Sequence, residues 1–267
     1  IFIVTGVGLA GALVSPPIAN VRRWIRLGPI GLQPAEFAKL TSAIFLAFYL
    51  DRKRSKAESP LWGLAVPAGM VSVLLLLIAR QPDLGTPILM FCVALLVLFI
   101  GGAKVQYVLA ALLCALPVLV YELLRFPYRR ARLLSFLNPF AQAQGAGYQL
   151  SQSITAVGSG GWLGKGFGAS KLKLSYLPVP HTDFIFPVVC EELGLLGALL
   201  LIALFVVLLI RGVRIARGAP NLFGMLLACG LTFSLCLQAF FNMGISIGLL
   251  PTKGIPLPFI SFGGSSL

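Results

Sequence analysis

Residues 184–210 read FIFPVVCEELGLLGALLLIALFVVLLI, and this apolar run decides the fold class. A helix needs about 20 consecutive apolar residues to cross a bilayer, so the run predicts a membrane-spanning helix. Outward from it, similar runs predict further spans, of which the first and the last look truncated. They cover residues 1–15, 35–50, 61–79, 86–102, 105–124, 222–250 and 258–267. The prediction is an all-α, polytopic transmembrane helical bundle that forms a single domain over residues 1–267.

The composition supports this class. Hydrophobic residues make up 58% of the chain and charged residues 11%, and the mean hydropathy is +0.95. Soluble domains carry roughly 25% charged residues. The apolar runs are continuous rather than alternating, which favours helices over a transmembrane β-barrel. All five cysteines lie inside these runs and none forms a CxxC pair, so they are predicted to be buried apolar side chains rather than disulfides or metal ligands.

The basic residues lie mainly in the loops between the apolar runs. The net charge is +13, but no aromatic-interleaved basic domain is present. This distribution favours anionic headgroups or a phosphorylated lipid over nucleic acid as the partner. Short loops on the side of residues 51–59 carry more lysine and arginine than short loops on the other side, which places that loop in the cytoplasm. The loop at residues 125–182, with 58 residues, is too long for an ordinary connection and is predicted to be functional.

Carboxylates near the membrane are the first candidates for a functional site. An acidic side chain inside a bilayer is costly unless it is paired, hydrated or neutralised. Five of the eight acidic residues lie at or within predicted membrane boundaries: Glu36, Asp83, Asp183, Glu191 and Glu192. Glu36 and Lys39 follow Pro34 and are three residues apart, on one face of a helix. They form either a structural ion pair or a pair that lines a polar cavity.

The other four carboxylates also leave alternatives open. Asp83 precedes Thr86-Pro87, which predict the start of the next helix, so Asp83 is either a turn residue or a site residue. Asp183 precedes the apolar run and follows His181, the one histidine of the chain. It is either a helix cap or a site carboxylate at the membrane surface. Glu191 and Glu192 cannot face the same way on a helix, so one is predicted to face a polar interior and the other to make a buried contact.

A segment rich in glycine and lysine, residues 158–173, resembles a phosphate cradle. It fails the P-loop pattern, because Lys165 is followed by Gly166 rather than by serine or threonine. The segment is either a flexible external loop or one whose lysines contact a pyrophosphate. The same two interpretations apply to three arginines near the start of the long loop: Arg129, Arg130 and Arg132.

Several strings, in this order along nearly the whole chain, resemble the SEDS family of shape, elongation, division and sporulation proteins, of the FtsW and RodA type. Each string alone is weak, whereas the ordered set is specific. The strings are Arg23-Trp24-Ile25, Gln33-Pro34-Ala35-Glu36-Phe37-Ala38-Lys39, Gln81-Pro82-Asp83-Leu84-Gly85-Thr86, Arg132 with Phe136-Leu137-Asn138-Pro139, Gly145-Ala146-Gly147-Tyr148-Gln149, Gly164-Lys165-Gly166, His181-Thr182-Asp183-Phe184-Ile185-Phe186, Glu191-Glu192-Leu193-Gly194, Leu250-Pro251-Thr252-Lys253-Gly254, and Leu257-Pro258-Phe259-Ile260-Ser261-Phe262-Gly263-Gly264-Ser265-Ser266.

The resemblance implies about ten transmembrane helices, of which about eight are covered here. It implies that residues 125–182 are extracytoplasmic and that the protein lies in the bacterial inner membrane. The implied activity is peptidoglycan glycosyltransfer, which joins lipid II units and releases undecaprenyl pyrophosphate, in cell division or shape maintenance. The implied partner is a class B penicillin-binding protein, a transpeptidase. Leu250-Pro251-Thr252-Lys253-Gly254 looks more like the division type, and Phe262 stands where tyrosine is more usual.

The family's catalytic aspartate falls on Asp183, which is the candidate general base. Cations are expected to stabilise the pyrophosphate leaving group. A divalent cation, Mg²⁺ or Mn²⁺, could share this role, although the sequence shows no complete ligand set. The rivals are a lipid II flippase, which Glu191 and Glu192 would favour, and a non-catalytic scaffold for a transpeptidase. The expected substrate-binding residues are Arg23, Glu36, Lys39, Gln81, Asp83, Arg132, Lys171, His181 and Lys253.

Overall fold

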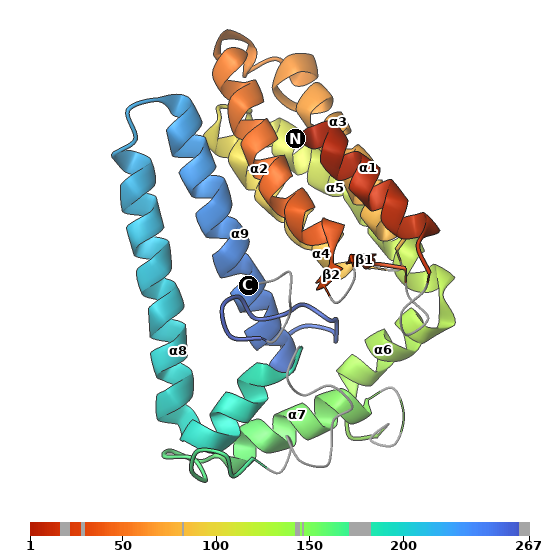
Figure 1. Cartoon of the computed structure of the whole chain (residues 1–267), viewed down its shortest axis with the longest axis vertical. Helices are drawn as coiled ribbons and strands as arrows, with labels where there is room; N and C mark the ends of the chain where they lie inside the picture. Colours follow the sequence, from red (N-terminus) through yellow and green to blue (C-terminus); the bar gives the residue numbers. More distant parts are fainter. Residues whose placement is uncertain are drawn as a thin grey trace. The chain divides into compact units, whose positions relative to one another are not determined.

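The computed structural model describes residues 1–16, 22–27, 30–81, 83–141, 145, 147–170 and 183–261. This part of the chain is almost entirely helical, as predicted (Figure 1). The α-helices are α1 (Phe2–Val14), α2 (Pro34–Arg52), α3 (Val66–Ala79), α4 (Gly85–Ile100), α5 (Val105–Arg125), α6 (Pro127–Leu137), α7 (Tyr148–Ser159), α8 (Ile185–Arg217) and α9 (Leu222–Ser246). Two short helices, η1 (Arg54–Lys56) and η2 (Pro60–Ala65), connect α2 to α3.

The helices reproduce most of the predicted spans. Among the described residues, four helical segments are long and apolar enough to cross a membrane: η2 with α3, α5, α8 and α9. Helices α1 and α4 are apolar but shorter, and α2 coincides with the span predicted at residues 35–50. The span predicted at 258–267 is not seen in its described part, because residues 258–261 form a turn; the remaining residues, 262–267, lie outside the described part.

A small β-hairpin is an exception to the all-α prediction. Strands β1 (Ile25–Leu27) and β2 (Ile30–Leu32) pair antiparallel, with Ile25 opposite Leu32. The hairpin precedes α2, which begins at Pro34. Proline is favourable in the first turn, because the backbone N–H that it lacks would have no partner within the helix there. Strands of three residues are too short to show a periodicity in the sequence, which is why they were not predicted.

The chain forms two compact units. The first contains Ile1–Leu113 and Leu208–Leu235, and the second contains Cys114–Val207 and Cys236–Leu267. In the first unit α1 packs on α2 and α3, and α4 packs on both α2 and α3. Their shared core consists of Leu9, Ala35, Ala38, Leu74, Ile78 and Met90.

Small residues let helices of the first unit approach closely. A Cβ atom added at Gly230, in the first part of α9, would lie 3.2 Å from the Cβ of Ala43 on α2. A hydrogen bond of 2.8 Å between Thr5 Oγ1 and Thr41 Oγ1 joins α1 to α2. Close contact through small side chains and polar bonds is how helices associate where lipid removes the hydrophobic driving force.

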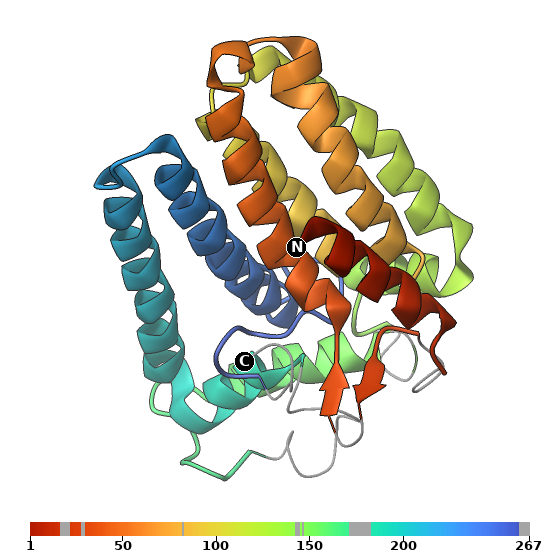
Figure 2. The same ribbon diagram turned by 45° about the horizontal axis from the view of Figure 1, so that its top comes forward.

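In the second unit, the predicted polar loop at residues 125–182 contains two helices. Helices α6 and α7 have 11 and 12 residues, too short to cross a bilayer. Helix α7 lies beside the first segment of α8 (Figures 1 and 2), where Ala156 and Val188 are packed together. The expectation that this stretch is extracytoplasmic stays a prediction.

Helix α8 is two segments joined by a kink at Gly194. Gly194 has φ 66° and ψ −163°, a conformation that is essentially restricted to glycine. The kink separates a short segment, which begins next to Asp183, from the long apolar segment (Figure 2). The continuous span predicted at 184–210 was therefore wrong at this one point, because hydropathy does not report a local backbone angle.

Candidate functional site

Asp183 lies two residues before α8 begins and is partly exposed. Its carboxylate lies over the backbone of Gly254, since a Cβ atom added at Gly254 would be 2.6 Å from Asp183 Oδ2. Gly254 follows Lys253, so the structure brings the predicted catalytic residue to the segment that carries one of the predicted substrate-binding cations. These two segments are far apart in the sequence and belong to the same unit.

A row of polar side chains on α9 holds these segments in place. Gln238, Asn242 and Ser246 are spaced four residues apart, so they share one face of the helix. Asn242 Nδ2 donates to the backbone oxygen of Asp183 at 2.8 Å and to that of Ile255 at 2.7 Å. Gln238 Nε2 donates to the backbone oxygen of Pro256 at 2.8 Å. These residues were not predicted from the sequence, although polar residues at this spacing in an apolar run are a recognisable signal.

The same row continues to α7. Ser246 Oγ donates to the backbone oxygen of Asn242 at 2.8 Å, and the backbone oxygen of Ser246 accepts a hydrogen bond of 2.6 Å from Ser153 Oγ. Asn242, Ser246 and Ser153 are all at most 1% exposed. These hydrogen bonds fix α7 against α9, and neither of them involves Asp183 or the segment with Lys253.

Glu191 is held by an ion pair in the second unit. Its Oε1 lies 2.7 Å from Lys165 Nζ, and its Oε2 accepts a hydrogen bond of 2.7 Å from Ser170 Oγ. Glu192 is also buried, and its Oε1 has no hydrogen-bond partner among the described residues. Glu191 is thus the residue that faces polar partners, a choice that the sequence left open.

The glycine-rich segment forms backbone hydrogen bonds to α8 at its kink. The N–H groups of Lys165 and Gly166 donate to the backbone oxygens of Glu191 and Glu192 at 3.0 and 3.1 Å. In return, Leu195 N donates to Gly161 O at 2.9 Å. A Cβ atom at Gly164 or Gly194 would collide with the backbone of the opposite segment. The glycines therefore allow two backbones to meet, and Lys165 is bound to Glu191 rather than available to a phosphate in this structure.

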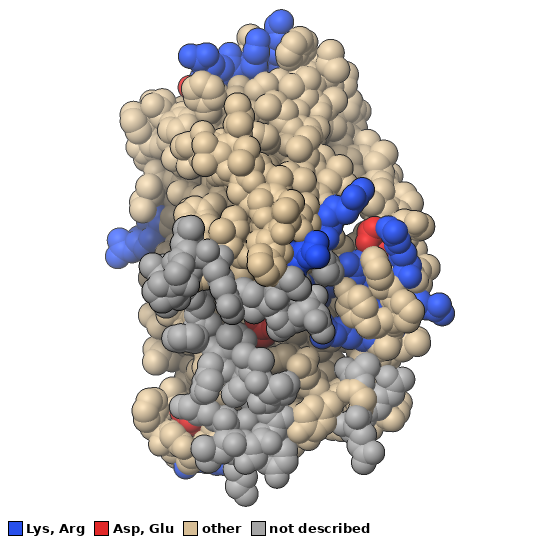
Figure 3. All heavy atoms as spheres, turned by 45° about the vertical axis from the view of Figure 1, so that its right-hand side comes forward, with Lys and Arg blue, Asp and Glu red and all other residues tan. Residues whose placement is uncertain are grey.

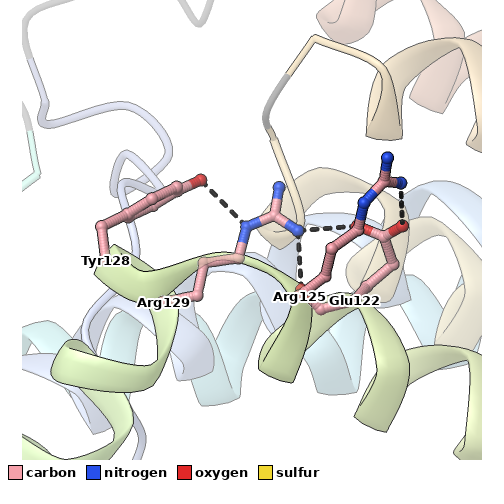
Figure 4. Close-up of polar contacts among 4 residues, drawn as sticks. All are labelled: Glu122, Arg125, Tyr128 and Arg129. Carbon is pink, nitrogen blue, oxygen red and sulfur yellow. Dashed lines mark hydrogen bonds and ion pairs between the residues drawn. The ribbon is translucent and has the colours of Figure 1, made fainter.

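The junction of α5 and α6 contains an ion pair between the buried Arg129 and the partly exposed Glu122, shown in Figure 4. Arg129 NH1 lies 2.7 Å from Glu122 Oε2, and Arg129 Nε donates to Tyr128 Oη at 2.9 Å. The guanidinium also stacks over the ring of Phe126, 4.4 Å from its centroid. Arg129 is thus a structural residue of the junction, whereas Arg130 is exposed and Arg132 is partly buried on α6, outside the described hydrogen bonds around Asp183.

The first unit carries five of the predicted substrate-binding residues. Arg23 Nε donates to the backbone oxygen of Gln81 at 2.9 Å, and Gln81 Nε2 donates to that of Leu9 at 3.1 Å. Gln81 is buried, and its Oε1 has no hydrogen-bond partner among the described residues. Glu36 Oε2 and Lys39 Nζ are 2.6 Å apart, with side chains 14% and 9% exposed. The structure therefore joins Arg23 to Gln81 and Glu36 to Lys39.

Asp83, the fifth of these residues, caps α4. Its Oδ1 accepts hydrogen bonds from the N–H groups of Gly85 and Thr86 at 2.9 and 3.3 Å, and its Oδ2 accepts one from Thr86 Oγ1 at 2.9 Å. Helix α4 begins at Gly85 after Leu84 as its N-cap, so the prediction of Thr86 as the N-cap and Pro87 as the first helical residue was wrong by two residues. The carboxylate supplies the missing acceptors for the first N–H groups of the helix, as side chains at this position commonly do.

Two predicted binding residues, Lys171 and His181, lie outside the described residues. Within the described ranges no group of three or more His, Cys, Asp or Glu side chains could hold a metal ion. The described residues therefore do not form a complete protein site for Mg²⁺ or Mn²⁺.

The helices and these polar networks define a multi-pass membrane protein in which a carboxylate at one end of a spanning helix meets a lysine-bearing segment. The whole chain, residues 1–267, matches the model of the cell cycle protein family of FtsW, RodA and SpoVE. The chain belongs to this family, as the ordered strings predicted.

Named relatives are similar over most of the chain. The probable peptidoglycan glycosyltransferase FtsW of Geobacter metallireducens (strain ATCC 53774 / DSM 7210 / GS-15) is 44% identical over 245 residues, which are 92% of this chain and 65% of that protein. The stage V sporulation protein E of Bacillus subtilis (strain 168) is 44% identical over 246 residues, 92% of this chain and 67% of that protein. The chain thus spans about two thirds of the length of these relatives.

Solved structures share the fold. A chain of a peptidoglycan synthase complex, described as coordinating polymerization and crosslinking, superposes with a TM-score of 0.82 at 31% identity and covers 100% of this chain and 75% of that one. The rod shape determining protein RodA of Thermus thermophilus superposes with a TM-score of 0.68 at 28% identity, covering 100% of this chain and 71% of that one.

Proposed function

We propose that the protein containing this chain is a peptidoglycan glycosyltransferase that polymerises lipid II at the outer face of the bacterial inner membrane, in cell division or shape maintenance. The observation that carries the proposal is the position of the Asp183 carboxylate over Gly254, next to Lys253. A carboxylate and a lysine segment are the two groups that this reaction needs, since a hydroxyl must be deprotonated and a pyrophosphate must leave. The names of the relatives support the same reaction class.

In the proposed reaction, Asp183 accepts the proton of the 4-hydroxyl of the acceptor sugar. The hydroxyl oxygen attacks the anomeric carbon of the lipid-linked donor and forms the new glycosidic bond. The bond from that carbon to the pyrophosphate oxygen breaks, and its electron pair leaves with undecaprenyl pyrophosphate. Attack opposite the leaving group inverts the anomeric centre, and no covalent enzyme intermediate is needed.

The cations have different parts in this proposal. Lys253 directly precedes Gly254, which lies beside the Asp183 carboxylate, and it would stabilise the negative charge that develops on the pyrophosphate. Arg23, Lys39 and Arg132 keep the substrate-binding role predicted from the sequence. Lys171 and His181 keep the binding role that the resemblance implies.

The structure weakens the argument for the flippase. A flippase would use buried carboxylates near the membrane midplane, and Glu191 and Glu192 were the residues that suggested it. Glu191 is instead paired with Lys165 and Ser170 beside a kink. A penicillin-binding protein of class B remains the proposed partner, and the structural relative that belongs to a peptidoglycan synthase complex supports an assembly of this kind.

The test uses the full-length protein, purified with its transpeptidase partner and supplied with labelled lipid II. Polymer is scored on a gel for wild type and for Asp183→Asn, which keeps the shape of the side chain and removes the base. We expect polymer from wild type and a loss of at least about 100-fold in Asp183→Asn. Asp51→Asn makes the same chemical change at an exposed position at the end of α2 and should retain wild-type activity.

Other outcomes would redirect the proposal. Equal polymer from wild type and Asp183→Asn would exclude Asp183 as the base. No polymer from wild type, with lipid II crossing vesicle membranes, would support the flippase. No polymer and no transport, with the transpeptidase still recruited, would support the scaffold.

A further inference from the structure

The amide of Asn242 connects the two segments of the proposed active site. Its Nδ2 donates one hydrogen bond to the backbone oxygen of Asp183 and a second to the backbone oxygen of Ile255, two residues after Lys253. Asn242 lies on α9 and is 1% exposed. One side chain thus holds the start of α8 and the segment with Lys253 at a fixed separation.

The orientation of the Asn242 amide follows from its hydrogen-bond partners. Both partners are backbone oxygens, which only accept hydrogen bonds, so the nitrogen of the amide must face them. The other end of the amide, Oδ1, has no hydrogen-bond partner among the described residues and is buried. A buried acceptor without a partner is costly.

The following inference rests on the proposed function. We infer that Asn242 is a positioning residue that sets the distance of the Asp183 carboxylate from the Lys253 segment. Asp183 itself is held at its backbone by Asn242 and confined on the other side by the backbone of Gly254. A displacement of about 1 Å in such a group costs on the order of 100-fold in rate. Asn242 would therefore affect turnover without touching the substrate.

Two variants separate the hydrogen bonds from the shape of the side chain. Asn242→Leu keeps a similar volume and removes both donors, and Asn242→Asp keeps the shape but turns oxygens toward the two backbone oxygens. Both should lower kcat for lipid II polymerisation by at least about tenfold and leave KM within about twofold, because substrate contacts are unchanged. The measurement uses the full-length protein with its transpeptidase partner, and rates are normalised to the folded fraction.

Ser153→Ala is the matched control. It also removes a buried hydrogen bond to α9, from Ser153 Oγ to the backbone oxygen of Ser246, but it contacts neither Asp183 nor the Lys253 segment. We expect it to lower the midpoint of thermal unfolding about as much as Asn242→Leu and to leave kcat near wild type.

The outcomes distinguish this inference from the proposed function. If wild type polymerises lipid II, Asp183→Asn is inactive and Asn242→Leu has the kcat of Ser153→Ala, then the function stands and the positioning role of Asn242 is wrong. Wild-type kcat in Asn242→Asp would have the same meaning, since even a protonated carboxyl group can donate only one of the two hydrogen bonds. If wild type makes no polymer, the proposed function fails first, and the positioning role fails with it.

Discussion

Among single residues, Gly254 is the position where a substitution would most directly displace the Asp183 side chain. The φ angle of Gly254 lies outside the left-handed region, so glycine is needed here for space and not for its backbone freedom. The nearest atom to an added Cβ is the end of the Asp183 side chain, which can move without a change in the backbone. Substitution at position 254 therefore displaces the proposed base while the fold remains.

We predict that Gly254→Ala lowers the polymerisation rate by at least about tenfold while the thermal unfolding midpoint changes little. The control is Gly158→Ala on α7, where an added Cβ meets nothing within 4 Å. Rates and unfolding curves of both variants are compared with wild type. Wild-type turnover in Gly254→Ala would show that the close contact between Asp183 and residue 254 is not needed for activity.

Single residues also show what the sequence could reveal about the site. Asp183 and Lys253 were predicted from the ordered strings, and both lie at the proposed site. Asn242 was not predicted, because an isolated polar residue in an apolar run has many uses and its two partners are backbone atoms of distant segments. Its spacing of four from Gln238 and Ser246 is the signal that could have identified it.

Among the elements, the kink of α8 depends on a loop that is distant in sequence. Kinking frees the backbone oxygens of Glu191 and Glu192, and N–H groups of the glycine-rich segment bind them. The glycines of that segment suggested a phosphate cradle, because a close approach of backbone to a ligand and a close approach of backbone to backbone require the same residue. Hydropathy predicted the position of the helix but could not predict this contact.

The ion pair between Lys165 and Glu191 holds this loop on the kink, and it can be tested by stability. We predict that Lys165→Ala lowers the free energy of unfolding by about 1–3 kcal/mol, because Glu191, with its side chain 3% exposed, loses its ion-pair partner. The double variant Lys165→Met with Glu191→Gln should recover most of the loss, since it removes both charges.

Thermal unfolding in detergent measures these changes, and Lys104→Ala is the control. Lys104 pairs with Glu58 at 3.3 Å, but the two side chains are 47% and 77% exposed, so its removal should change stability little. Equal losses in Lys165→Ala and Lys104→Ala would mean that the buried pair does not stabilise the loop.

For the whole molecule, the sequence predicted the positions of the apolar helices better than the arrangement of the site. The apolar runs identified α1 to α5, α8 and α9 because lipid selects for composition over a whole segment. Helices α6 and α7 were missed because they are short and carry polar residues, such as Arg130 and Gln149. The contact of Asp183 with residue 254 depends on how distant segments fold together, which composition does not encode.

The structure sharpens the prediction of membrane orientation. Basic side chains gather at the end of α2 and on η1 (Figure 3), namely Arg52, Lys53, Arg54 and Lys56. From there the chain passes through three apolar helical segments, η2 with α3, α4 and α5, before it reaches α6. Three crossings would put α6 and η1 on opposite sides of the membrane. Because α6 and α7 are too short to cross, Asp183 is expected on the same side as α6.

We therefore predict that Ala141→Cys reacts with a membrane-impermeant maleimide on spheroplasts, while Ser55→Cys reacts only after lysis. Both positions are exposed, so access to solvent is matched. Each cysteine is introduced into the full-length protein in a background without other reactive cysteines. Labelling of Ser55→Cys alone on intact spheroplasts would put Asp183 on the cytoplasmic side, where a base could not act on lipid II after its transfer to the outer face. Labelling of both would mean that one of the three helical segments does not cross the membrane, and α4, with 16 residues, would be the first to re-examine.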